Sequence, residues 1–107
     1  MILPKEKLAS LDPAFQEILT RISVKLPFPL YITEGVPASK EGSHVKESEH
    51  FEGLGVDVRV KGGWERHTIV KAALEEGLKR IGVYNAHVHL GMSKTLPSPV
   101  LWVGKSA

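Results

Sequence analysis

The sequence contains no cysteine, and this absence limits the chemistry available to the chain. A disulfide framework is excluded, and any metal site must be built from His, Asp or Glu side chains. Long apolar runs are also missing: none approaches the roughly 20 residues needed to cross a bilayer, so we expect no membrane span. Residues 1–6 lack the apolar core and cleavage site of a signal peptide. This predicts synthesis in the cytoplasm without a signal peptide.

Neither sign of charge is in large excess. Fourteen Lys and Arg against twelve Asp and Glu give a net charge of +2, and the 107 residues have the composition of one soluble globular domain. The pI of about 9.0 is basic, but the lysines are scattered and interleaved with acids rather than gathered in a stripe. We therefore expect no nucleic-acid partner. The prediction is a single domain over residues 1–107 that acts as a monomer.

Two segments have apolar residues at helical spacing. The first runs from Leu11 to Lys25, with Asp12 as its N-cap and Pro13 at its first position. The second follows the glycine pair at 62–63, and Gly82 is expected to be its C-terminal cap. Its predicted apolar stripe consists of Val70, Leu74, Leu78 and Ile81.

Four segments are predicted to be strands: 30–33, 54–60, 83–92 and 100–103. In the second of these, apolar residues alternate with Gly55, Asp57 and Arg59, which is typical of a strand with one buried face. The order of helices and strands predicts an α+β domain with a small, mainly antiparallel sheet and helices packed on one face. Residues 34–53 are expected to form a polar loop, and a loop of about twenty residues is a candidate for function.

Four polar residues, His50, Asp57, His87 and His89, could supply the ligands of one metal ion. His87 and His89 lie two apart on a predicted strand, so both project from one face, about 6–7 Å apart. Asp57 lies on the polar face of another strand, and the glycines before it would let His50 fold back onto the same ion. Two imidazoles and one carboxylate are a common set of catalytic zinc ligands, with water in the fourth position. The alternative for any single histidine is an ordinary solvated or hydrogen-bonded side chain.

The sequence around these residues resembles a known family. Ser48-Glu-His50-Phe-Glu-Gly53-Leu-Gly55-Val-Asp57 is similar to the S-x-H-x-x-G-x-A-x-D signature of zinc D-Ala-D-Ala carboxypeptidases and L-alanyl-D-glutamate endopeptidases. These are bacterial and phage peptidoglycan peptidases that share their fold with the Hedgehog signalling domain. Residues 81–89, followed by 101–104, look like that family's closing segment. The resemblance covers roughly residues 12 to 104 and implies a Hedgehog/DD-peptidase-like fold.

The resemblance also implies roles for individual residues. His50, Asp57 and His89 would be the ligands of Zn²⁺, and Ser48 would lie in the substrate groove. His87 would be the catalytic base as the first member of an H-x-H pair. The implied activity is that of a hydrolase: a zinc metallopeptidase that cleaves a peptide bond of peptidoglycan stem peptides with metal-activated water. Such an enzyme would serve cell wall degradation, for example as a phage lysis or virion protein.

Other candidates lie in the predicted long loop. Many relatives carry an arginine that contacts the substrate in the segment that corresponds to residues 33–40; here Lys40 would take its place, as a point charge rather than a bidentate group. Lys40 or Arg59 could pair with a substrate carboxylate. His44 is either a substrate contact or a solvated side chain. The glutamates of this region are expected to be mostly surface acids, with Glu34 able to enter the cleft; they are Glu34, Glu47, Glu49 and Glu52.

The missing arginine leaves a second hypothesis open. The chain could keep the fold and the zinc but lack efficient catalysis, and act as a metal-binding module for binding or assembly. An intact His87 favours the enzyme over this alternative.

Overall fold

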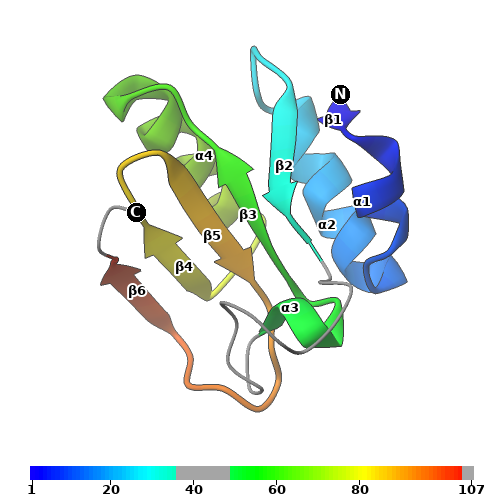
Figure 1. Cartoon of the computed structure of the whole chain (residues 1–107). Helices are drawn as coiled ribbons and strands as arrows, with labels where there is room; N and C mark the ends of the chain where they lie inside the picture. The colour runs from blue at the N-terminus through cyan, green and yellow to red at the C-terminus, as the bar shows by residue number, and fades with distance from the viewer. Residues whose placement is uncertain (36–48, 105–107) are drawn as a thin grey trace.

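A mixed six-stranded sheet organises the chain (Figure 1). The computed structural model describes residues 1–35 and 49–104. Within them the strand order is β1-β2-β3-β5-β4-β6. The three central pairs are antiparallel, and the pairs at the two edges, β1–β2 and β4–β6, are parallel. The strands are β1 (Ile2–Leu3), β2 (Leu30–Glu34), β3 (Gly55–Arg59), β4 (Arg80–Val83), β5 (His87–Gly91) and β6 (Val100–Val103). The predicted α+β class with a mainly antiparallel sheet is confirmed.

The two long helices cover one face of the sheet, and polar residues lie on the other. The helices are α1 (Lys5–Ala9), α2 (Pro13–Val24), α3 (Glu49–Glu52) and α4 (Gly63–Glu75). The two long helices, α2 and α4, lie behind the sheet in Figure 1, and α1 lies beside β1 and β2. The core between helices and sheet contains Phe15, Leu19, Ile22, Ile69, Ala73, Ile32, Val56, Val58, Val88 and Leu90. We call the opposite face of the sheet the open face. No helix in the described part of the chain is long and apolar enough to cross a membrane.

The first predicted helix is confirmed, and its start has a clear local cause. The Asp12 side chain accepts a hydrogen bond from the Ala14 N–H at 2.9 Å, and Pro13 occupies the first turn, where its missing N–H costs nothing. The helix ends at Val24, with Lys25 as its C-cap. Two elements before it, β1 and α1, were not predicted from the sequence.

The second predicted helix is right in its start and wrong in its end. α4 ends at Glu75, and Gly77 follows in the left-handed region with φ of +86°. Leu74, which was predicted in the buried stripe, is 54% exposed, because the helix buries Ile69, Ala72 and Ala73 instead. The apolar residues after Gly77 continue into a strand. The spacing of apolar residues alone did not show where α4 ends and where the following strand begins.

Gly82 lies in strand β4 and is not a helix cap. The indole of Trp102, on the neighbouring strand β6, covers it so closely that a Cβ at this position would collide with the ring. The predicted strand 83–92 is in fact part of a hairpin: β4 turns at residues 84–86 into β5, where the Tyr84 N–H donates to the His87 carbonyl at 3.0 Å.

The predicted strands 54–60 and 100–103 correspond to β3 and β6, and 30–33 corresponds to β2. The predicted loop 34–53 is wrong at both ends. Glu34 belongs to β2, and Glu49–Glu52 forms the short helix α3. Residues 36–48 lie outside the described part of the chain.

Candidate metal centre

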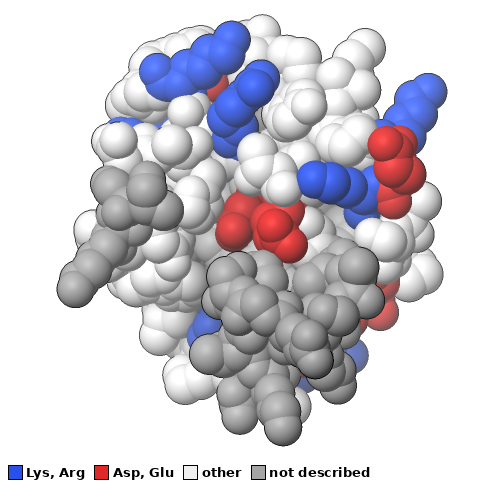
Figure 2. Space-filling view, viewed as in Figure 1, with Lys and Arg blue, Asp and Glu red and all other residues white. Residues whose placement is uncertain are grey.

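Strand pairing places two of the predicted ligands side by side. β3 and β5 are antiparallel neighbours, and Asp57 lies directly opposite His89 in their ladder. Because Val56 and Val58 point into the core, the residue between them points to the open face. Figure 2 shows acidic side chains gathered in the middle of the face seen in Figure 1, with Lys and Arg side chains near them.

Two glycines bring the third predicted ligand to the same place. Gly53 has a φ of +72°, a conformation that reverses the chain between α3 and β3. At Gly55 an added Cβ would lie 2.6 Å from the Glu49 Cβ and 3.0 Å from the His89 ring. Only a residue without a side chain lets α3 pack this closely on the sheet. As a result His50, on α3, reaches the metal-facing side of Asp57.

The three side chains form a compact donor set. Asp57 Oδ1 lies 3.0 Å from His89 Nδ1 and 3.5 Å from His50 Nε2, and the three ligand atoms all lie within 4.8 Å of one another. Both histidines are buried. The ligand atoms of a tetrahedral zinc ion are separated by about 3.3 Å, given bonds of about 2.0–2.1 Å. The group could therefore hold a metal ion with little rearrangement.

The outer hydrogen bonds of the two histidines fix the nitrogens that face the centre. His50 Nδ1 lies 3.1 Å from the Gly35 carbonyl oxygen, which can only accept, so Nδ1 donates to it and Nε2 is the nitrogen that faces Asp57. His89 has a carboxylate at each ring nitrogen, Glu49 at 2.7 Å from Nε2 and Asp57 at 3.0 Å from Nδ1, so with a metal ion at Nδ1 the Nε2–H would donate to Glu49. A histidine ligand held by a carbonyl or carboxylate on its other nitrogen is the usual arrangement in metal sites.

Glu49 is the functional residue that sequence analysis missed. It was expected at the surface, but it is 2% exposed. One carboxylate oxygen accepts from His89, and the other accepts from the Ser93 N–H at 2.8 Å and lies 3.0 Å from Arg80 Nε. Gly91 is a sequence feature that relates to this burial. It lies two residues beyond His89 on the same strand face, and a Cβ at Gly91 would collide with the Glu49 carboxylate. The missing side chain at that position makes room for the buried acid.

The electrostatics of the cluster favour a cation at its centre. Burial of Asp57 would raise its pKa, but hydrogen bonds with His50 and His89 outweigh burial and lower the pKa far below its ordinary value. Burial of His89 would lower its pKa, but its bonds to Asp57 and Glu49 outweigh burial and raise it. Both ring nitrogens of His89 face carboxylates, and a neutral imidazole has only one N–H. A second proton or a metal ion at Nδ1 resolves this conflict.

His87 lies beside the donor set. It follows the same strand face as His89, with Nε2 3.8 Å from Asp57 Oδ2, and its side chain is 27% exposed. The Tyr84 ring stacks on the imidazole with a centroid distance of 4.2 Å, and the Tyr84 hydroxyl accepts from Trp102 Nε1 at 3.0 Å. The aromatic pair holds the imidazole at the rim of the centre while leaving it accessible.

Of the residues predicted to contact substrate or enter the cleft, two lie in the described part of the chain. Ser48, Lys40 and His44 lie outside the described residues. Arg59 lies on the open face, two residues beyond Asp57 and opposite His87 in the β3–β5 ladder. Glu34 pairs with Asp57 across β2 and β3.

Comparison with known proteins adds no identification. No protein family matches the chain, and a search of curated proteins finds no match. The resemblance to peptidoglycan peptidases therefore stays a prediction from motifs, and the geometry of the centre has to carry the functional argument.

We expect Glu49→Gln to weaken zinc binding about 10- to 100-fold, the usual effect of losing an outer partner of a metal-bound histidine. The amide keeps the shape of the side chain but offers one acceptor oxygen where the carboxylate offers two. Competition with a chromophoric chelator measures the affinity. The matched control is Glu52→Gln, an exposed acid on the same short helix. Equal affinity in the Glu49→Gln variant and the original chain would show that the buried carboxylate has no part in metal binding.

Proposed function

We propose that the protein is a zinc metallopeptidase that hydrolyses a peptide bond in peptidoglycan stem peptides with a metal-activated water. One observation carries the proposal: His50, Asp57 and His89 form a buried three-ligand set, and an accessible fourth polar side chain, His87, lies next to it. Catalytic zinc sites use three protein ligands and keep one position for water or substrate. A purely structural site would normally be closed by a fourth protein ligand.

The donor types support zinc. Imidazole nitrogen and carboxylate oxygen suit this ion, and the chain has no thiolate that would favour a softer metal. When bound, zinc would polarise the scissile carbonyl and lower the pKa of a coordinated water to about 7.

The residues of the chain then have distinct tasks. With a metal ion bound, Glu49 and the Gly35 carbonyl would accept hydrogen bonds from the outer nitrogens of the two histidines and leave the inner nitrogens as ligands. His87 Nε2 takes a proton from the attacking water and returns it to the leaving amine. A general base in this position typically raises the reaction rate 10²–10⁴-fold. The stacked Tyr84 ring orients the imidazole for this transfer.

The substrate class rests on the Ser48–Asp57 signature and the H-x-H pair, which resemble peptidoglycan peptidases. The open face supports it in a general way: in the described residues, α3 packs at the Gly55 end of β3, and no helix covers the Arg59 end on this face. In this account the protein acts on the cell wall, in the setting of phage lysis or of a virion.

Digestion of purified peptidoglycan sacculi tests the proposal. We expect the zinc-loaded protein to release fragments whose new peptide termini are identified by mass spectrometry, and we expect a chelator to stop the release and added zinc to restore it. Sacculi and soluble stem peptides that remain intact in the presence of fully zinc-loaded protein would overturn the enzyme and favour the metal-binding module.

A further inference from the structure

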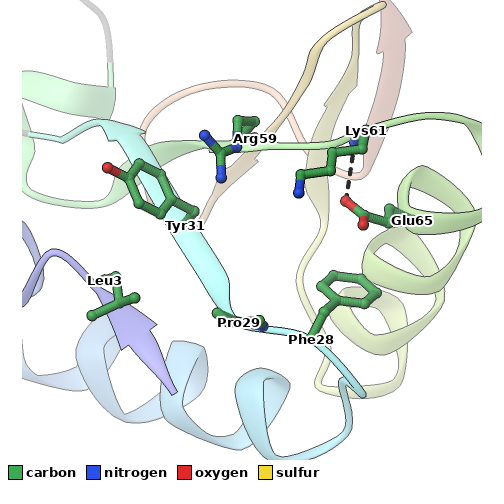
Figure 3. A pocket seen from close by; sticks show the side chains of 7 residues that line it. All are labelled: Leu3, Phe28, Pro29, Tyr31, Arg59, Lys61 and Glu65. Atoms are coloured by element: carbon green, nitrogen blue, oxygen red, sulfur yellow. Dashed lines mark hydrogen bonds between the residues drawn. The ribbon is translucent and has the colours of Figure 1, made fainter.

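A pocket separate from the metal centre lies on the open face, at the end of β2 and β3 away from α3 (Figure 3). Its volume is about 280 Å³, toward the small end for ligand pockets. Its walls combine apolar and aromatic side chains with three charged ones. The residues that matter here are Leu3, Phe28, Tyr31, Arg59, Lys61 and Glu65.

Arg59 is the central cation of this pocket. Its guanidinium carbon lies over the Tyr31 ring, 4.4 Å from the ring centre, a cation–π arrangement that holds the group beside the ring. A cation–π contact does not require a hydrogen-bond acceptor, so the N–H donors of Arg59 can still bind a carboxylate. Among the described residues Arg59 has no carboxylate partner.

Lys61 adds a second positive charge on the same side. It lies two residues beyond Arg59, so both side chains leave the chain on the open face, and Figure 3 shows both reaching toward the pocket. The Glu65 carboxylate is the opposing charge, but it already accepts the Lys61 backbone N–H at 3.0 Å. Within the part of the chain that the structure describes, the Lys61 amine makes no ion pair. The pocket therefore has one positive charge in excess.

We propose that this pocket binds a free carboxylate of a bound peptide, with Arg59 as the anchor. The guanidinium edge matches a carboxylate in two parallel hydrogen bonds, and Leu3, Phe28 and Tyr31 offer apolar contact to the aliphatic part of the residue that carries it. A neutral or cationic ligand in the pocket would leave Arg59 and Lys61 without a negative partner.

The position of the pocket connects it to the metal centre. Arg59 is two residues from Asp57 on one strand face, a distance of about 7 Å along β3. A peptide with its scissile bond at the centre would place a group from two residues away in the pocket. The identity of the ligand as a stem peptide rests on the proposed function, and the carboxylate could be a branch carboxylate or the peptide's own C-terminus.

The test is a titration of the zinc-loaded, ¹⁵N-labelled full chain with the tripeptide L-Ala-γ-D-Glu-L-Lys. Two neutralised forms are compared with it: one amidated at the D-Glu α-carboxylate and one amidated at the C-terminus. We expect the Arg59 Nε–H signal and the indole signal of Trp64, which contacts Phe28, to shift on binding. We expect one amidation to weaken binding about tenfold, the effect of about 1.4 kcal/mol. The form that loses affinity identifies the carboxylate.

Three variants test whether the preference for the free acid over the amides depends on Arg59. Arg59→Gln should remove the preference for the acid, whereas Glu65→Gln should strengthen acid binding a few-fold, because it removes the opposing charge and keeps an acceptor for Lys61. Arg21→Gln, at an exposed arginine on α2, is the matched control and should change nothing. Equal affinity for the acid and both amides, or a preference that survives Arg59→Gln, would overturn the inference.

The same samples report cleavage of the peptide, so the two proposals can fail separately. Acid-selective binding at Arg59 without cleavage supports the pocket and contradicts the peptidase. Cleavage with no acid preference contradicts the pocket and leaves the peptidase standing.

Discussion

Asp57→Ala should abolish zinc binding and with it the zinc-dependent part of the protein's stability. Asp57 Oδ1 is the atom that both other ligands face, and without it two buried histidines are left to bind the ion alone. An ion bound only by the folded state stabilises it by about 4 kcal/mol at a thousand times the dissociation constant. For a domain of this size that corresponds to a rise in Tm of roughly 15 °C or more.

Thermal unfolding with and without added zinc measures this effect. The original chain should show the rise in Tm, and Asp57→Ala should show none. The matched control is Asp12→Ala: it removes the N-cap of α2 and lowers the free energy of unfolding by about 1 kcal/mol, but keeps the full response to zinc. A zinc response in Asp57→Ala equal to that of the original chain would place the ion elsewhere.

His87→Ala should lower the rate of peptide hydrolysis by about 10²-fold or more while zinc stays bound. Its imidazole lies next to the donor set and is accessible at the rim, so its loss removes the proton acceptor without removing a ligand. The measurements are kcat and KM on soluble stem peptides, together with the zinc content of the same samples. His67→Ala, at an exposed histidine on α4, is the matched control.

Two outcomes would contradict the role of His87. If the variant also loses zinc, both histidines of β5 hold the ion, the site is closed, and a structural metal is the better account. If it keeps both zinc and full activity, the proton acceptor is another group, and Glu34, opposite Asp57 in the sheet, is the first to test.

Elements governed by local rules could be predicted from the sequence. α2 follows from a capping aspartate, a proline at its first position and a stripe of apolar residues, and these act within a few residues of one another. The alternation in β3 fixes which side chains are buried, and this places Asp57 on the open face. Strand periodicity and a glycine turn also predicted that His50, Asp57 and the His87–His89 pair lie close together, and the family resemblance selected His89 as the ligand.

Features that depend on distant contacts could not be predicted. Gly82 has its place because Trp102, twenty residues later, packs on it, and no local pattern distinguishes this from a helix cap. α3 has only four residues, too few to be stable by propensity, so it forms through its contacts with the sheet. Glu49 is buried by partners 31 to 44 residues away in the sequence, which are Arg80, His89 and Ser93.

The most direct test of the account is the zinc content of the purified chain. After exposure to zinc and removal of unbound metal, elemental analysis should find about one zinc per chain, and His50→Ala should reduce this to background. One zinc per chain that disappears with this single ligand is the result the account predicts. A chain without stoichiometric zinc, or a full complement of zinc in His50→Ala, would contradict it.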